Sequence, residues 1–416
     1  MRRRQFLGLS MLVLPGSRLG ATPGQEPTGA VAPGASTLMA GTARQRDAAT
    51  LRLFLCGDVM TGRGIDQILP RQSSPEIYES YLTSAVQYID IAERVSGPIP
   101  HPVDYAYVWG DALDILQAAA PHARIVNLET AVTDSDDNWP GKRIHYRMHP
   151  GNVPVLSAAG IDCCALANNH VLDWGYSGLQ DTLDHLHRAR ISTAGAGPDH
   201  RRAVQPAVLE VKPGQRVIVL SMGATSSGIA PAWAAGEEKP GVWLLDDFTA
   251  AGVELVHYQV QAVKRPGDIV IASIHWGGNW GYTMPAQAQQ FAHGLIDHAQ
   301  VDLVHGHSSH HPRGIEVYRN KLILYGCGDF INDYEGITGR ENYRGDLRLM
   351  YLPEIDAASG ELTDLTMPVL QSRRFSLRHA DTEDAAWLAA ELHRESRRLG
   401  QIRIEVEDTT LRARWG

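Results

Sequence analysis

Cysteine, positive charge and long apolar runs are all scarce in this sequence of 416 residues. The four cysteines lack the paired spacing of a zinc ribbon or a disulfide scaffold, so we expect free thiols in the core. Lys and Arg together number 38 against 47 Asp and Glu, which gives a formal net charge of -9. Such a chain offers no basic field to a phosphate backbone, and nucleic acid is therefore excluded as a partner.

The start of the chain is basic and then briefly apolar. Arg2, Arg3 and Arg4 precede Phe6 and Leu7, and the apolar run that follows is too short to span a bilayer, so we expect no mature transmembrane helix. Residues 1–21 resemble a twin-arginine export signal, which predicts an exported protein of the periplasm or cell envelope. An apolar start without a targeting role is the alternative.

The composition after this start is that of an ordinary globular protein. Residues 22–50 are rich in Pro, Gly, Ala and Thr without periodicity, so we expect a flexible linker. Apolar strand-like runs then alternate with helical segments over residues 51–335, which predicts an α/β domain. No second linker divides residues 51–416, and we expect residues 336–416 to form a β/α extension packed on the same domain.

Four histidines occur within seven residues in the stretch Val304-His305-Gly306-His307-Ser308-Ser309-His310-His311-Pro312. Packing alone seldom requires such a concentration of imidazoles. It indicates metal binding or proton transfer.

Polar side chains follow five separate strand-like runs, the last of which leads into the histidine cluster. Strand ends of this kind are where α/β folds place their chemistry. In chain order the candidates are Asp58, Glu129, Asn169 with His170, His275, and His307 with His310. Each has a bland interpretation when it is taken singly: Asp58 or the asparagines as helix caps, and His275 as a core histidine. Five strand ends that each present a metal-capable atom favour a joint site. The glycines around Asp58 would allow close approach of a ligand, and Arg63 is a candidate to hold an anion.

A family resemblance rests on these same strand ends. The motifs are Gly57-Asp58-Val59-Met60, Asn127-Leu128-Glu129, Asn168-Asn169-His170 with Asp173 and Gly175, His275-Trp276-Gly277, and Gly306-His307 with His310. Over roughly residues 51–335 the chain resembles the CapA family, the poly-γ-glutamate capsule biosynthesis proteins. That family is similar to calcineurin-like metallophosphoesterases, which implies a four-layer α/β/β/α sandwich with mixed sheets and a metal site at the strand ends.

The resemblance also implies roles for the candidate residues. The implied ligands of a divalent metal (Mn, Fe, Zn or Mg) are Asp58, Glu129, Asn169, His275, His307 and His310. The implied catalytic residues are His170 as general acid, with His275, Asp58 and Arg63. His305 and His311 would support the ligands from outside.

The chain departs from the phosphoesterase pattern at two of these positions. Met60 stands where a ligand histidine is expected, and its thioether is a poor ligand for a hard metal. Glu129 replaces an aspartate, and its extra methylene moves the carboxylate outward. Full occupancy of a two-metal centre is therefore not predicted.

Several functions remain open at this point. The first is biosynthesis, export or trimming of a poly-γ-glutamate-like capsule or envelope polymer, with an anionic polymer or peptide as substrate and a membrane-bound polymer synthase as partner. The alternatives are a metal-dependent hydrolase of phosphodiesters or amides, a metal-independent acid/base enzyme that acts on peptides as an epimerase would, and a non-catalytic binding protein.

Overall fold

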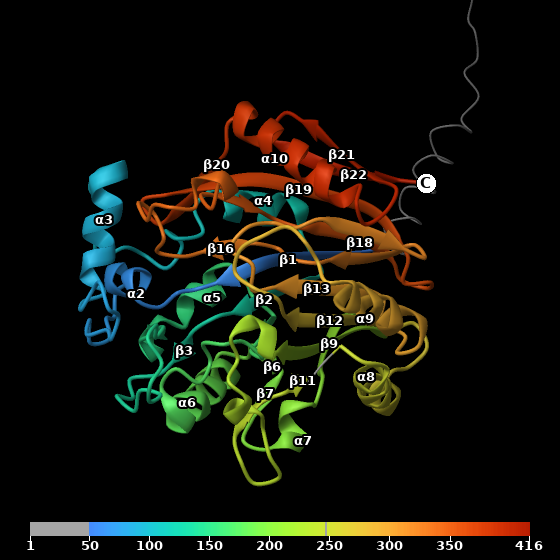
Figure 1. Cartoon of the computed structure of the whole chain (residues 1–416), viewed down its shortest axis with the longest axis horizontal. Coiled ribbons are helices and arrows are strands. Elements are labelled where there is room, and N and C mark those ends of the chain that lie inside the picture. The colour runs from blue at the N-terminus through green and yellow to red at the C-terminus, as the bar shows by residue number, and fades with distance from the viewer. Residues whose placement is uncertain (1–49, 246–247) are drawn as a thin grey trace, which may run out of the picture. The chain divides into compact units, whose positions relative to one another are not determined.

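The computed structural model describes residues 50–245 and 248–416, all of which belong to one structural unit. The predicted export signal, and the predicted linker up to residue 49, lie outside the described residues. Thr50, placed in the linker by sequence, is instead the first residue of β1 (Thr50–Val59). Two large mixed sheets form the centre of this unit (Figure 1).

The first large sheet is built around β1. On one side of β1 lie β2 (Ala123–Leu128), β5 (Cys163–Ala165) and β6 (Ser192–Ala194), in that order. All three run parallel to β1. On the other side β1 pairs antiparallel with β18 (Leu352–Asp356), and the sheet continues through β19 (Leu362–Arg373), β22 (Thr410–Trp415) and β21 (Ile402–Glu407). Three short strands complete it: β16 (Asp329–Ile331), β17 (Leu347–Leu349) and β20 (Ser376–His379).

The second large sheet has a parallel centre with antiparallel edges. Its order is β11 (Leu244–Leu245), β9 (Gln215–Ala224), β12 (Ile269–His275), β13 (Leu303–His307), β15 (Lys321–Leu324) and β14 (Ile315–Tyr318), with β8 (Ala207–Lys212) paired to β9. The hairpins β8–β9 and β14–β15 are antiparallel, as the turn residues between them predict. Two smaller pairs lie outside both sheets: β3 (Ala131–Val132) with β4 (Arg147–Met148), and β7 (Ala196–Gly197) with β10 (Gly241–Val242).

Strand alternation in β1 explains how the layers form. Leu51, Leu53 and Leu55 enter a core shared with strands of the second sheet, whereas Phe54 and Cys56 enter a different core on the opposite face. Because successive side chains point to opposite faces, one apolar strand serves two cores.

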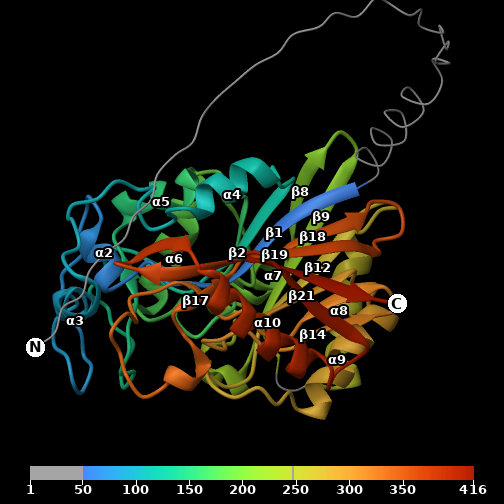
Figure 2. The same cartoon turned by 90° about the horizontal axis from the view of Figure 1, so that it is seen from above.

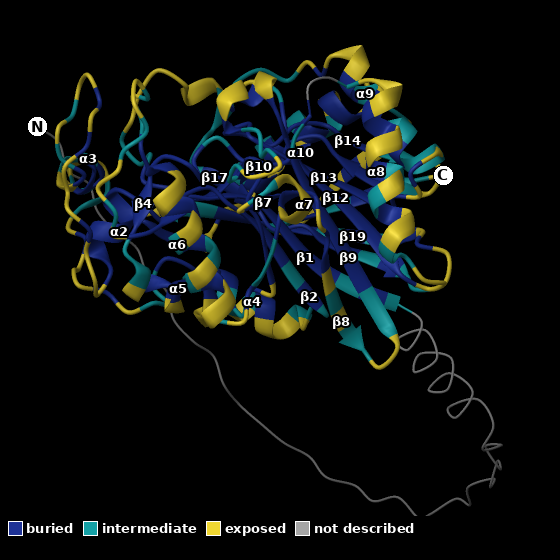
Figure 3. Cartoon of the chain, turned by 90° about the horizontal axis from the view of Figure 1, so that it is seen from below, coloured by how far each residue is buried: buried dark blue, intermediate teal, exposed yellow. Residues whose placement is uncertain are grey.

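Helices cover the outer face of each large sheet. On the first sheet the Phe54 core also holds residues of α2 (Gly64–Ile68), α3 (Val86–Ser96), α4 (Ala112–Ala119), α5 (Pro154–Ala158) and α6 (Gly175–Arg188). On the second sheet a third core holds residues of α8 (Ala250–Val263) and α9 (Ala286–Asp297). Except for α2, which is buried along its whole length, these helices expose their outer faces, and the strands between them are buried (Figure 3). The predicted α/β/β/α order of layers is therefore confirmed.

The carboxyl-terminal strands extend the first sheet rather than forming a sheet of their own. Helix α10 (Thr382–Ser396) contacts β21 and β14, and its apolar side packs into the core between the sheets (Figure 2). Among residues 50–245 and 248–416 the remaining α-helix is α7 (His200–Ala203). Strand β18 lies after residue 335 and pairs directly with β1, so no break between sheets marks that position. The division at residue 335 stays a prediction.

Two further expectations can be compared with the structure. All four cysteines are free and buried, as expected. Turns occupy residues 105–111 before α4 begins. Among the described residues no helix combines the length and apolar character needed to cross a membrane.

Candidate functional site

The site lies where parallel strands of both large sheets end. Asp58 is the penultimate residue of β1, Glu129 directly follows β2, and His275 and His307 are the last residues of β12 and β13. His275 and His307 are register partners, and so are Asp58 and Asp329 of β16. Because register partners on parallel strands point to the same face, these two pairings place four side chains at one edge.

One group of metal-capable atoms comes from Asp58, His275 and His307. Their ligand atoms all lie within 4.8 Å of one another, and all three residues are buried. The two rings face each other, with His275 Nδ1 2.8 Å from His307 Nδ1. A carboxylate and two imidazoles are a usual donor set for Zn, Fe or Mn.

A second group also contains Asp58, together with His310 and Asp329. His310 Nδ1 lies 2.8 Å from Asp329 Oδ1, and the Asn332 amide donates to Asp329 Oδ2 at 2.6 Å. Asp329 is the member that the sequence did not predict as a ligand. The feature that could have drawn attention to Asp329 is its position directly after Gly328, where β16 begins. Its register partner on β1 is Asp58.

Asp58 is thus shared by both groups. One of its oxygens accepts from the Asn127 amide at 2.8 Å, whereas the buried Oδ2 has no hydrogen-bond partner among the described residues. Burial, and then the nearby Asp329 carboxylate, raise the pKa of Asp58 to about 7. Burial and the Asp58 carboxylate also raise the pKa of Glu129. A cation would offset both effects, so the residues fit a metal between the two groups.

Glu129 and Asn169, both predicted ligands, lie beside the two groups. Asn169 Oδ1 is 3.0 Å from His275 Nε2, and Glu129 Oε1 is 4.0 Å from the same nitrogen. The Asn127 amide bridges Glu129 and Asp58, and the Asn168 amide donates in turn to Asn127 Oδ1 at 3.1 Å. These asparagines fix the carboxylates, a role that the sequence analysis did not assign.

His170 faces Glu129 from the loop after β5. Its Nε2 is 3.7 Å from Glu129 Oε1, and its Nδ1 is 2.7 Å from Asp173 Oδ2. Lys142 Nζ also lies 3.0 Å from Nδ1, but the nearer Asp173 carboxylate can only accept, so we assign the hydrogen to Nδ1 and the lone pair to Nε2. Lys142 binds the same Asp173 carboxylate. Burial lowers the pKa of His170 to about 4 despite Asp173, so the ring is neutral at pH 7.

The two outer histidines of the cluster differ in position. His305 supports the site, because the Ser273 hydroxyl lies 3.1 Å from His305 Nδ1 and 2.9 Å from His307 Nε2. His305 Nε2 is in turn 2.7 Å from the Cys56 carbonyl oxygen. His311 instead stacks on Trp280 and accepts from the Gly281 N–H.

Arg63 does not present a free guanidinium to the site. It is 3% exposed and donates to Asp333, Glu79 and Tyr88. The Glu79 and Asp333 carboxylates neutralise the buried Arg63 guanidinium inside the fold. This corrects the expectation that Arg63 holds a substrate anion. Met60 is likewise buried, and its N–H donates to the Ile331 carbonyl oxygen at 2.8 Å.

A cavity of about 230 Å³ opens onto this arrangement. Glu129, Asn169, His170 and His310 line it together with the cations Lys142 and Arg143. The predicted strand-end residues therefore do meet, and a ligand in this cavity would contact Glu129, Asn169, His170 and His310 directly.

The motifs along the strands match a family model. The model of the bacterial capsule synthesis protein PGA_cap matches residues 52–334. The chain belongs to this family. It is 50% identical over 360 residues to a probable polyglutamine synthesis accessory protein of Mycobacterium tuberculosis, which covers 86% of this chain and 94% of that protein. It is 25% identical to the capsule biosynthesis protein CapA of Bacillus anthracis over 70% of this chain and 62% of that protein.

A solved phosphatase from Mycoplasma pneumoniae is a more distant structural neighbour. Its TM-score is 0.44 at 11% sequence identity, with 77% of this chain and 94% of that chain covered.

Proposed function

We propose that this PGA_cap family member trims an acidic, poly-γ-glutamate-like polymer of the capsule or cell envelope by metal-assisted hydrolysis of its amide bonds. The observation that carries the proposal is the sharing of Asp58. One buried carboxylate with an unpartnered oxygen lies between two sets of donors, beside a cavity lined by a neutral histidine. A binding protein without catalysis would not need such costly burial of acids.

The substrate class follows from the relatives. The mycobacterial relative is named for polyglutamine synthesis and the Bacillus relative for capsule biosynthesis. Lys142 and Arg143 in the cavity wall are suited to an acidic ligand. A substrate with one carboxylate per residue fits both observations.

The donor groups of Asp58 with His275 and His307, and of Asp58 with His310 and Asp329, would hold the metal. A divalent ion held there supplies a Lewis acid for the amide carbonyl and lowers the pKa of water. His170 Nε2 accepts a proton from the attacking water and later donates it to the leaving nitrogen. Asp173 accepts from His170 Nδ1 and so keeps the tautomer that this transfer requires, and Lys142 holds the Asp173 carboxylate in place. Asn169 Oδ1 holds the His275 ring, and both Asn169 and Glu129 line the cavity that would receive the substrate.

The cellular setting is part of the proposal. The arginine-rich start favours export to the periplasm or envelope, where a membrane-bound polymer synthase would be the natural partner. Fusing residues 1–50 to a reporter that folds in the cytoplasm tests export directly. A reporter retained in the cytoplasm would contradict it.

The test of hydrolysis compares metal-loaded and chelated protein on poly-γ-glutamate, with chain length followed by gel electrophoresis and bound metal by mass spectrometry. We expect shortening only with metal, and none with His307→Ala. Equal turnover by metal-free protein would rule out metal assistance, and solvent deuterium in an unshortened polymer would indicate the acid/base alternative. Cleavage of a chromogenic phosphodiester but not of the polymer would favour phosphodiester hydrolysis. Binding without any turnover would leave a binding protein.

A further inference from the structure

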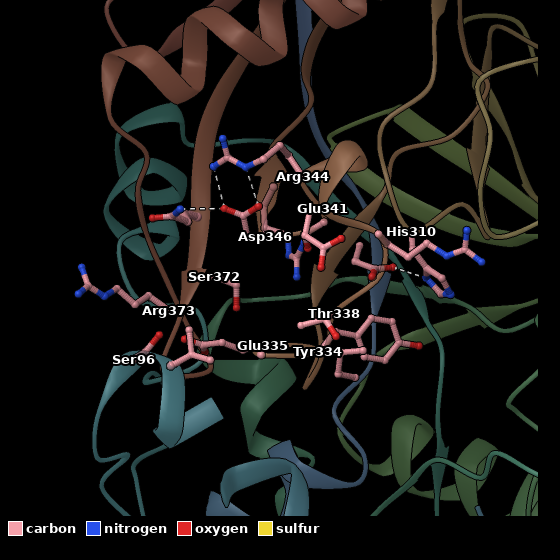
Figure 4. Close-up of a pocket in the computed structure, with 18 of the residues that line it drawn as sticks. Ser96, His310, Tyr334, Glu335, Thr338, Glu341, Arg344, Asp346, Ser372 and Arg373 are labelled. Atoms are coloured by element: carbon pink, nitrogen blue, oxygen red, sulfur yellow. Dashed lines mark hydrogen bonds and ion pairs between the residues drawn. The ribbon is translucent and has the colours of Figure 1, made fainter. Parts of the chain in front are cut away.

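A second, larger cavity adjoins the site on its other side. It measures about 520 Å³ and lies among residues 334–348, the end of β19 and Trp280. Figure 4 shows His310 and Tyr334 on one side of it and Ser372 across from them. His310 and Tyr334 also line the smaller cavity, and Asp329 lines the larger one. His310 of the second donor group therefore lies in a wall that the two cavities share.

The floor of the larger cavity holds a buried cation. Arg348 is 1% exposed, and within the described residues no carboxylate lies within 4.0 Å of its guanidinium. Its Nη2 donates to Asn332 Oδ1 at 2.8 Å, while its Nε has no partner in the described chain. Through Asn332 this guanidinium connects to Asp329 of the second donor group. A buried arginine with an unused donor points to an anionic ligand.

The rim of the larger cavity holds an exposed cation. Arg340 lies over the Trp280 ring, 5.3 Å from its centroid, and forms no ion pair with any described residue. The neighbouring Arg344 differs, since Asp346 and Asp384 neutralise it.

The carboxylates of this cavity are already engaged. Glu335 accepts from the Phe375 N–H and Glu341 from the Gly339 N–H. Asp346 accepts from Arg344, and Asp329 from His310 and Asn332. Glu335 Oε1 is the one buried carboxylate oxygen here that has no partner among the described residues, whereas Arg340 keeps a free cation at the rim.

Apolar side chains also line the larger cavity, beside the polar Ser96, Thr338 and Ser372. Val95, Ile337 and Trp280 contribute to its wall, and Ile337 is 47% exposed. A γ-linked glutamyl chain has two methylenes and one carboxylate per residue, so it presents both apolar and anionic groups at short spacing. Such a wall and such cations suit that chain better than a purely ionic polymer.

The smaller cavity carries a matching cation at its mouth. Arg143 is exposed and forms no ion pair within the described residues. We propose that an acidic chain lies across both cavities, with carboxylates held by Arg340 and Arg348 on one side and by Arg143 on the other. The bond presented to the donor groups is then internal to the chain. This inference rests on the proposed function and adds that the cleavage is internal rather than terminal.

The chemistry balances for an internal amide. Water adds its oxygen to the carbonyl carbon, the C–N bond breaks, and one proton passes to the leaving nitrogen. Each event gives two shorter chains, one with a new carboxylate and one with a new amine. No oxidant, reductant or second substrate is needed.

The test has a binding arm and a product arm, both with the full chain. For binding, fluorescence anisotropy follows a labelled γ-linked glutamate oligomer with chelated protein. We expect Arg340→Gln and Arg143→Gln each to weaken binding roughly 10-fold, the loss of about one charge-assisted contact. The control Arg188→Gln, on the exposed last turn of α6 and outside both cavities, should bind as wild type does. Wild-type binding by both cavity variants, or a loss in only one of them, would overturn a chain that spans both cavities.

For products, metal-loaded protein acts on long poly-γ-glutamate and early fragments are sized. We expect fragments of intermediate length before any single residues. Release of single residues from the outset would overturn internal cleavage and leave the proposed hydrolysis intact. If both variants lose binding but no polymer is shortened, the spanning site stands and the hydrolytic function fails.

Discussion

His310 Nδ1 lies 2.8 Å from Asp329 Oδ1, a buried contact between the loop after β13 and the first residue of β16. Burial opposes a charge on the ring, yet Asp329 raises the pKa of His310. The contact makes Asp329 a full member of the second donor group. It also brings into the site a residue that the motif pattern left aside.

Replacing Asp329 with Asn should therefore weaken metal binding. The amide keeps the shape of the side chain but removes a charged donor, and we expect a loss of roughly 10- to 100-fold in affinity. Calorimetric titration of chelated protein measures this. Asp346→Asn serves as control, since Asp346 pairs with Arg344 and belongs to neither donor group. Equal affinity of Asp329→Asn and wild type would remove Asp329 from the ligand set.

The ring of His307 is oriented by a hydroxyl behind it. Ser273 Oγ lies 2.9 Å from His307 Nε2, so Ser273→Ala should loosen the ring and lower metal affinity by about 10-fold. Ser221 is the register partner of Ser273 on β9 and bonds instead to the Ala167 N–H. Ser221→Ala is therefore the matched control. The same titration should separate the two variants, and indistinguishable affinities would contradict this role of Ser273.

Proton transfer by His170 should depend on Asp173. An asparagine there no longer enforces the Nδ1–H tautomer, and we expect Asp173→Asn to lower kcat by about 10²- to 10⁴-fold. The bound metal and KM should stay near wild-type values, because Asp173 contacts neither donor group. Asp181→Asn, whose carboxylate accepts from Thr133 on the outside of the site, is the control. A loss of metal in Asp173→Asn would instead indicate a structural effect.

The sequence predicted the strand-end residues because apolar runs end visibly at Asp58, His275 and His307. It also supported the layered α/β fold, through strands buried on both faces. Asp329 could not be placed in this way, since the parallel pairing of β1 with β16 joins segments about 270 residues apart. Sequence spacing carries no record of that register.

Arg63 illustrates the opposite error. A guanidinium in a glycine-rich strand-end loop is typical of an anion site, and only the fold brings Glu79 and Asp333 to it. The sequence likewise did not predict that Arg340 and Arg348 line one cavity. Arg340 precedes and Arg348 lies within β17, and their cavity forms only where Trp280 and β19 close it.

Gly57 is required by the approach of β16 to β1. A Cβ built at this position would lie 1.5 Å from the Gly328 carbonyl oxygen, the acceptor of the Asp58 N–H. Because backbone cannot yield cheaply, Gly57→Ala should destabilise the fold by about 3 kcal/mol. Gly278→Ala, where a Cβ meets nothing within 4 Å, should change stability little. Denaturant unfolding compares the two, and similar midpoints would contradict the tight approach.

The stability of the metal-free protein should fall with rising pH because of Asp58. Burial raises the pKa of Asp58 to about 7, whereas an unfolded aspartate titrates near 3.9. Between these values the folded state binds more protons than the unfolded state. The favourable contribution is thus complete below about pH 4 and is lost as pH rises through about 7.

Asp58→Asn removes this contribution together with the rise that the Asp58 carboxylate causes in the pKa of Glu129, which acts in the same direction. Burial lowers the pKa of His275 and of His307, which gives the opposite slope, but both proteins share those histidines. In the presence of chelator we expect the variant to gain on the order of 2 kcal/mol relative to wild type between pH 5 and pH 8. Urea unfolding at four pH values in this interval measures the difference. Stability curves of equal slope would mean that Asp58 is already ionised in the folded metal-free protein. Some group other than a bound cation would then have to stabilise its charge.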